Sequence, residues 1–172
     1  MIERLAFLTV QVGATLVVTL PLIIHWMLNR KWMRLPPPSP DACKDEDLPT
    51  LCIVIPTWNE GNVIESKLDD TFAQRYPESK RRILLIDSAS TDDTVSIARD
   101  WSKSNKCNME IVVMPARLGK SAAMNRAMQE LQDDDDVFIM TDAEATLEDG
   151  ALRRIGRWMK DPSIGAVCGC IN

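Results

Sequence analysis

The longest apolar feature of the chain is an uninterrupted run near its start. Leu5 to Leu28 spans 24 residues without a single Asp, Glu, Lys or Arg, and roughly 20 apolar residues suffice to cross the hydrocarbon core of a bilayer. A signal peptide, the alternative, would have an apolar region of roughly 7–15 residues followed by a small-residue cleavage site. The pattern therefore predicts an uncleaved transmembrane helix.

Basic residues are concentrated on one side of this run. Arg30, Lys31 and Arg34 follow it, whereas Arg4 alone precedes it. Positively charged flanks stay on the cytoplasmic side, so we expect a single-pass membrane protein with its N-terminus outside and its remaining chain in the cytoplasm. Residues 1–34 then form an anchor in contact with membrane lipid.

The next segment, residues 35–49, reads LPPPSPDACKDEDLP. Proline followed by acidic residues is typical of an extended, solvated linker. We therefore expect the globular domain to occupy residues 50–172.

Within that domain, short apolar runs alternate with stretches of helical periodicity. Continuous apolar runs are typical of buried parallel strands, which we expect at residues 50–55, 82–86, 110–114 and 137–141, with a fifth beginning at 164–167. Helices are expected over 63–72, 95–101, 121–131 and 147–159. Repeated units of this kind predict an α/β fold with a Rossmann-like, mostly parallel sheet and helices on both faces.

Composition narrows the function classes. The hydrophobic share of 45% permits a real core, and the net charge of −5 with a pI near 4.9 argues against a nucleic-acid partner. Five cysteines lack the paired spacing of a zinc site, so we expect structural thiols in a reducing compartment.

Polar residues follow each of the four expected strands. In an open parallel sheet, ligands bind outside the carboxyl ends of the strands. The segments at those ends are Pro56–Glu60, Asp87–Thr94, Pro115–Lys120 and Thr141–Ala145.

These segments contain neither G-x-G-x-x-G nor G-x-x-x-x-G-K-[ST]. Asp142 and Glu144 lie two positions apart and could share one Mg²⁺ or Mn²⁺ ion, which is often held by carboxylates together with phosphates. Arg117 and Lys120 add positive charge suited to a diphosphate. The alternative is that the two carboxylates belong to a solvated loop before a helix. The acidic run Asp133–Asp136 is expected to be a solvated turn.

Four motifs in order resemble the family 2 glycosyltransferases of GT-A fold. PTWNE resembles the family's P-x-[YF]-N-E, IDSASTDDT its (V)DDGSTDGT, RLGKSAAMN its R-x-GK-x-x-A-x-N, and TDAEA its D-x-D region. The resemblance covers residues 50–172, and the branch most similar contains the cellulose, hyaluronan and poly-N-acetylglucosamine synthases.

The resemblance implies an inverting transfer of a sugar from a UDP-sugar donor to a glycan or lipid-linked acceptor, with Mg²⁺ or Mn²⁺ as cofactor. It implies metal ligation by Asp142 and Glu144 and a contact between Asp87 and the pyrimidine ring. The residues it places at the nucleotide-sugar are Pro56, Thr57, Asn59, Glu60, Asp87, Ser90, Asp92, Arg117, Gly119, Lys120, Asn125 and Asp142.

This sequence departs from the family pattern in three ways. Asp-Asp-Gly appears as Asp87-Ser88-Ala89, and Glu144 replaces an aspartate. The catalytic base and the acceptor site are expected beyond Asn172. A non-catalytic nucleotide-binding fragment is therefore an alternative function. A nucleotidyltransferase is another, although the Gly-rich loop usual after its first strand is missing here.

Overall fold

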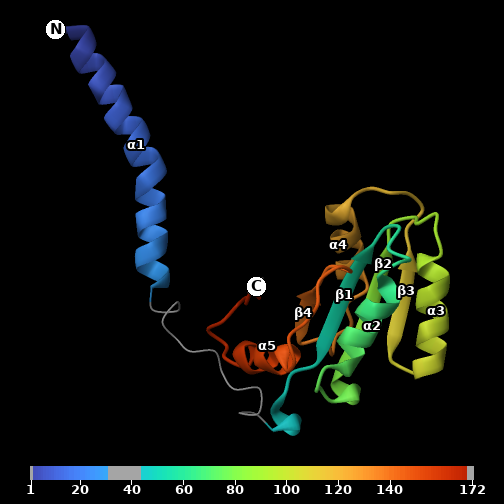
Figure 1. Ribbon diagram of the computed structural model, residues 1–172. Helices are drawn as coiled ribbons and strands as arrows, with labels where there is room; N and C mark the ends of the chain where they lie inside the picture. The colour runs from blue at the N-terminus through green and yellow to red at the C-terminus, as the bar shows by residue number, and fades with distance from the viewer. Residues whose placement is uncertain (1, 31–43, 170–172) are drawn as a thin grey trace. The chain divides into compact units, whose positions relative to one another are not determined.

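The computed structural model describes residues 2–30 and 44–169. The chain forms two separate compact units, Met1–Pro37 and Pro38–Asn172 (Figure 1). The first contains one helix, α1 (Ile2–Asn29). Lys31 and Arg34, which carry much of the predicted orientation signal, lie outside the described residues.

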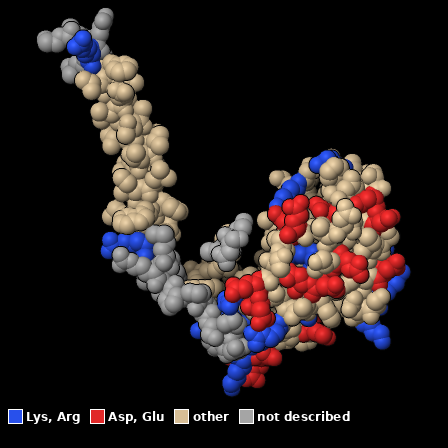
Figure 2. Space-filling view, viewed as in Figure 1, with Lys and Arg blue, Asp and Glu red and all other residues tan. Residues whose placement is uncertain are grey.

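Helix α1 is long and apolar enough to cross a membrane. The stretch Val10–Asn29 has a mean hydropathy of 1.7 and is not buried against any other part of the protein. Figure 2 shows an uncharged surface between basic side chains at the two ends of this helix. Length and composition support the predicted span over Leu5–Leu28, although a signal sequence has the same properties.

Three polar side chains of α1 form hydrogen bonds within the helix. The hydroxyls of Thr15 and Thr19 each donate a 2.9 Å hydrogen bond to the carbonyl four residues earlier, and the Asn29 amide donates to the His25 carbonyl at 2.8 Å. Such internal bonds are what a lipid environment requires, because it offers no water to polar groups.

The second unit is built on a four-stranded parallel sheet with the order β3-β2-β1-β4. The central pairs align Leu51 with both Arg81 and Val137. The strands are β1 (Leu51–Thr57), β2 (Arg81–Asp87), β3 (Met109–Val113) and β4 (Val137–Met140). These are the four predicted strands, each within about two residues of its expected bounds.

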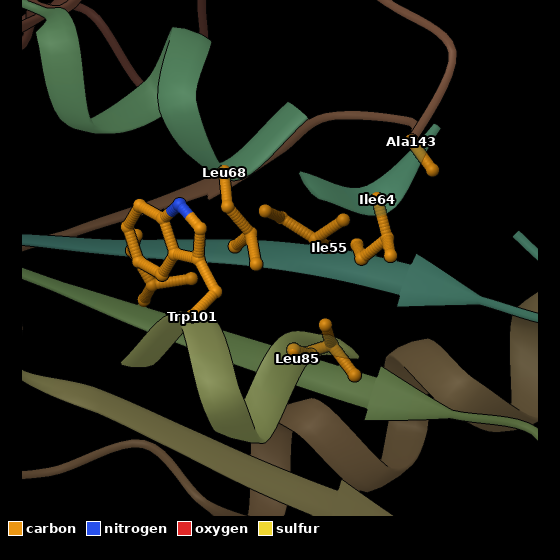
Figure 3. Close-up of a cluster of buried hydrophobic side chains, with 8 residues drawn as sticks. Ile55, Ile64, Leu68, Leu85, Trp101 and Ala143 are labelled. Carbon is orange, nitrogen blue, oxygen red and sulfur yellow. The ribbon is translucent and has the colours of Figure 1, made fainter. Parts of the chain in front are cut away.

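Side chains alternate between the two faces of the sheet, and each face is covered by helices. On one face, Ile55 and Leu85 pack against Leu68 and Trp101 in a single cluster (Figure 3). On the other face, Val54 packs with Ala123 and other small or apolar residues. The covering helices are α2 (Ile64–Ala73), α3 (Thr94–Asn105), α4 (Lys120–Gln129) and α5 (Ala151–Met159). The predicted α/β class is confirmed.

Several boundaries differ from the prediction; among them, helix α3 extends to Asn105, four residues beyond its expected end. Residues 164–167 form no strand, because the described chain after α5 continues as irregular structure. Helix α5 begins at Ala151 instead of residue 147, after Gly150 adopts a left-handed φ of 76°. Leu48 is buried in a core cluster, and a short 3₁₀ turn at Asp45–Asp47 precedes it. Packing of the globular unit thus starts before Thr50, inside the segment expected to be linker.

The acidic run Asp133–Asp136 is only partly the solvated turn that was expected. The Asp135 side chain is 2% exposed and accepts hydrogen bonds from Arg82, whose Nε lies 2.9 Å from Oδ1. Asp136 accepts a 2.8 Å bond from the Thr50 backbone N–H. Two of the four carboxylates therefore hold the amino-terminal edge of the sheet together.

Cys52 and Cys107 fit a structural role, whereas Cys168, the third cysteine in the described residues, is exposed. Cys52 is buried in β1, and burial raises the pKa of its thiol to about 11. A thiol with that pKa is protonated at neutral pH and is a poor nucleophile or metal ligand. Cys43 and Cys170 lie outside the described residues.

Candidate functional site

A cavity of about 330 Å³ lies at the carboxyl edge of the sheet. The strand order reverses between β1 and β4, because β2 and β3 lie on one side of β1 and β4 on the other. Ligands of open α/β sheets bind at such a reversal. The lining residues are Pro56, Thr57, Trp58, Glu60, Ser88, Arg117, Gly119, Lys120, Asp142, Ala143 and Glu144.

The loops that follow β1 and β2 are joined by hydrogen bonds from the first loop to the second. The backbone N–H groups of Asn59 and Glu60 donate to the hydroxyls of Ser90 and Thr94, both at 2.8 Å. The Gly61 N–H donates to Asp92 at 3.0 Å.

Another hydrogen bond runs from the second loop to the first: the Thr91 N–H donates to the side-chain oxygen of Asn59 at 2.8 Å. The polar side chains of Asn59, Ser90 and Asp92, predicted to contact a nucleotide, are thus used to shape one wall of the site.

Asp87 is fully buried at the end of β2. Its carboxylate accepts bonds from the Thr57 hydroxyl at 3.3 Å, from the Ser90 hydroxyl at 2.5 Å and from the Ser90 N–H at 2.9 Å. It does not line the cavity, whereas the next residue, Ser88, does. Ala89 then takes a left-handed φ of 59°, a conformation that glycine adopts more readily.

Trp58 and Arg117 form the apolar side of the cavity. The Arg117 guanidinium lies 3.2 Å from the centre of the Trp58 ring, and the indole is 38% exposed. This is a cation–π contact at an accessible position. The stack keeps a positive charge at the cavity, and no acidic side chain in the described part of the chain forms an ion pair with it.

The amino terminus of α4 brings a second cation to the cavity. Gly119 caps the helix with a φ of 85°, which a residue with a side chain would adopt only under strain. The Lys120 ammonium lies 2.5 Å from Asp142 Oδ1, and both side chains are about half exposed. A helix amino terminus with a lysine is well suited to bind a phosphate.

The loop after β4 presents two carboxylates on one side. Thr141 and Ala143 are buried, whereas Asp142 and Glu144 are exposed and line the cavity. Burial raises the pKa of the Glu60 carboxyl above its ordinary value, and so does repulsion from Glu144 and neighbouring carboxylates. The site therefore carries an excess of negative charge that a cation would relieve.

The residues present fit a divalent cation held jointly with a ligand. In the described chain, no cluster of three or more His, Cys, Asp or Glu side chains forms a metal site of its own. Asp142 and Glu144 offer oxygen atoms on the same side of one loop, and the Lys120 ammonium already serves as a positive partner for Asp142. Mg²⁺ is commonly bound by one or two carboxylates completed by phosphate oxygens.

The structure brings most of the predicted site residues together. Those that line the cavity are Pro56, Thr57, Glu60, Arg117, Gly119, Lys120, Asp142 and Glu144. Those that do not are Asn59, Asp87, Ser90, Asp92 and Asn125. Trp58, Ser88 and Ala143 also line the cavity and were missed, although each stands inside a motif whose other positions were singled out.

The parallel sheet, its reversed strand order and this cavity define an α/β domain of the GT-A type. The chain belongs to the family described as glycosyl transferase family 2, whose model matches residues 52–172.

Relatives and a solved structure support that assignment. An N-acetylglucosaminyltransferase of Rhizobium sp. (strain N33) is 28% identical over 133 residues, covering 77% of this chain and 29% of the relative. The O-antigen chain rhamnosyltransferase WbaN of Salmonella anatum is 28% identical over 122 residues, covering 71% of this chain and 37% of the relative. The chain thus spans about a third of the length of these relatives.

The mannosyltransferase PcManGT of Pyrobaculum calidifontis, solved with GDP-Man and Mn²⁺, superposes with a TM-score of 0.69. It is 28% identical, and the match covers 90% of this chain and 44% of that one.

Proposed function

We propose that this chain is the donor-binding part of a membrane-anchored, inverting glycosyltransferase that uses a UDP-sugar and a glycan or lipid-linked acceptor. The observation that carries the proposal is the cavity at the strand reversal, where two cations and three carboxylates meet. This set of charges suits a diphosphate bound together with a divalent cation. The cationic side chains would attract the diphosphate, and the carboxylates would attract the metal ion. Within the family, we propose that the chain belongs to the branch that contains the cellulose, hyaluronan and poly-N-acetylglucosamine synthases.

In the proposed reaction, an acceptor hydroxyl attacks the anomeric carbon, the bond to the diphosphate breaks, and a base takes the hydroxyl proton. Lys120 and Arg117 would contact the leaving diphosphate, and Asp142 and Glu144 would hold Mg²⁺ or Mn²⁺. The metal would supply charge stabilisation for the leaving group. The base is proposed to lie beyond Asn172.

Base recognition is proposed to involve the hydroxyls of Thr57 and Ser88, which line the cavity, in place of the buried Asp87. The similar mannosyltransferase was solved with GDP-Man, so a guanine nucleotide is the alternative donor to be tested. The resemblance to UDP-dependent enzymes leads us to propose uracil.

Isothermal titration with UDP, GDP and ADP, each with Mn²⁺, tests the donor. We expect UDP to bind most tightly, by roughly fivefold, because one additional hydrogen bond contributes about 1 kcal/mol. Tighter binding of GDP or ADP, or equal affinities, would exclude a uracil pocket. Binding of none of the three would overturn the proposed function itself.

Membrane orientation is tested with reporters fused after Asn172. Because Arg30, Lys31 and Arg34 follow the apolar helix, we expect a fluorescent cytoplasmic reporter to be active and an alkaline phosphatase fusion to be inactive. Replacing the three basic residues by Gln is the matched control and should weaken the bias. An active phosphatase fusion would reverse the proposed topology.

A further inference from the structure

Lys67 is a buried cation beneath the acidic loop. It lies in α2, and its side chain is 1% exposed. Burial lowers the pKa of this amine, whereas the negative charges of Asp70 and Asp142 oppose that effect. Lysine is rarely buried without a specific set of partners, so its surroundings indicate what it does.

Its ammonium group contacts both ends of the loop that follows β4. Nζ donates to the Thr141 hydroxyl at 2.8 Å and to the Ala145 carbonyl at 2.5 Å, and it lies 3.6 Å from Asp70 Oδ2. An ammonium has three N–H donors, and three acceptors surround it here. The two loop contacts bracket Asp142 and Glu144.

Two other side chains of α2 form hydrogen bonds with the backbone just after this loop. The Asp70 carboxylate accepts a 3.0 Å bond from the Leu147 N–H, and the Gln74 amide donates to the Leu147 carbonyl at 3.3 Å. Helix α2 therefore holds the loop through polar groups at several points. Only Lys67 among these three brings a positive charge.

We infer that Lys67 is a positioning residue that fixes the 141–145 loop and thereby sets the affinity of Asp142 and Glu144 for a divalent cation. The inference rests on the proposed function. Both loop ends are tied to one atom, so the two carboxylates between them are held at a defined separation. The buried positive charge also offsets part of the repulsion between the carboxylates that line the cavity.

The test uses the whole chain and Mn²⁺ alone as the probe. Lys67→Met removes the donors and the charge while keeping a similar shape, and we expect it to weaken Mn²⁺ binding, measured by electron paramagnetic resonance, by roughly 10–100-fold, the usual loss for groups that orient metal ligands. Hydrogen exchange at the Ala145 N–H, which donates to the Asp142 carbonyl at 3.1 Å, should become faster.

Arg81→Met is the matched control. Arg81 is also buried, but its guanidinium donates to carbonyls at the end of α2, including Thr71 and Gln74 at 3.2 and 3.0 Å, and not to the loop. It should lower Tm without changing Mn²⁺ affinity. Thr141→Val removes one loop acceptor and should weaken Mn²⁺ binding in the same direction, which decides the matter if Lys67→Met does not fold.

The outcomes separate the two proposals. Equal Mn²⁺ affinity in the wild type and in the Lys67 and Thr141 variants would overturn the positioning role while leaving the proposed function intact. A wild-type chain that binds Mn²⁺ neither alone nor with a nucleoside diphosphate would overturn the proposed function. Unchanged exchange at Ala145 in Lys67→Met would overturn the positioning role in either case.

Discussion

Asp142→Asn is expected to weaken Mn²⁺-dependent binding of a nucleoside diphosphate by roughly 100-fold, at the upper end of ordinary coupling energies between two ligands. Asp142 and Glu144 repel a diphosphate unless a cation lies between them, so the metal and the nucleotide should each strongly increase the affinity of the site for the other. Isothermal titration of UDP with Mn²⁺ and with EDTA measures this dependence.

Glu144→Asp is the matched control, because it keeps a carboxylate and restores the residue usual in the family pattern. It should preserve or improve binding. If UDP binds equally well in EDTA and in Mn²⁺, or if Asp142→Asn leaves affinity unchanged, the carboxylate pair is a solvated loop and not a metal site.

Asp135→Asn is expected to lower the free energy of unfolding by about 3–5 kcal/mol, the usual cost of removing one partner from a buried ion pair. The change would leave the Arg82 guanidinium, 6% exposed, without its closest negatively charged partner. Urea denaturation of the two proteins measures the difference. Asp134→Asn in the same turn is the control; Asp134 is exposed, and its change should be within about 0.5 kcal/mol.

The same pair predicts a dependence on pH. Burial raises the pKa of the Asp135 carboxyl, but hydrogen bonds from Arg82 and from the Gln132 N–H outweigh it and hold the pKa below its ordinary value of 3.8. A depressed folded-state pKa stabilises the protein above the unfolded value, and that contribution is lost as the pH falls through the folded value. The free energy of unfolding of the wild type should therefore decrease as the pH falls through this acid range. Asp135→Asn should lack this part of the pH dependence. Equal stability of the two proteins at neutral pH would contradict the role of the pair.

The strands were predictable because their signal is local. Runs such as 83–86 are apolar without interruption, which occurs when both faces of a strand are covered. Because the strands are parallel, the loops that follow them lie at one edge of the sheet, so the sequence alone predicts that Lys120, Asp142 and Glu144 lie together.

The remaining errors concern contacts between distant parts of the chain. Asp87 and Ser88 are both buried and adjacent in the sequence, yet only Ser88 lines the cavity, and the sequence does not say which of the two does so. Asp135 has a partner 53 positions away, and the Lys67–Thr141 contact spans 74 positions. A lysine in an amphipathic helix and an aspartate in an acidic run both resemble ordinary surface residues until their partners are known.

The interlocked loops after β1 and β2 have a consequence for how this enzyme family could diversify. In the described chain, the bonds that join these loops involve Asn59, Ser90 and Asp92, and the side chains of Trp58 and Ser88 are not among them. The side chains that join the two loops are therefore different from those of Trp58 and Ser88, which line the cavity. Under the proposed function, we expect exchanges at Trp58 and Ser88 to alter donor binding while the hydrogen bonds between the two loops stay in place.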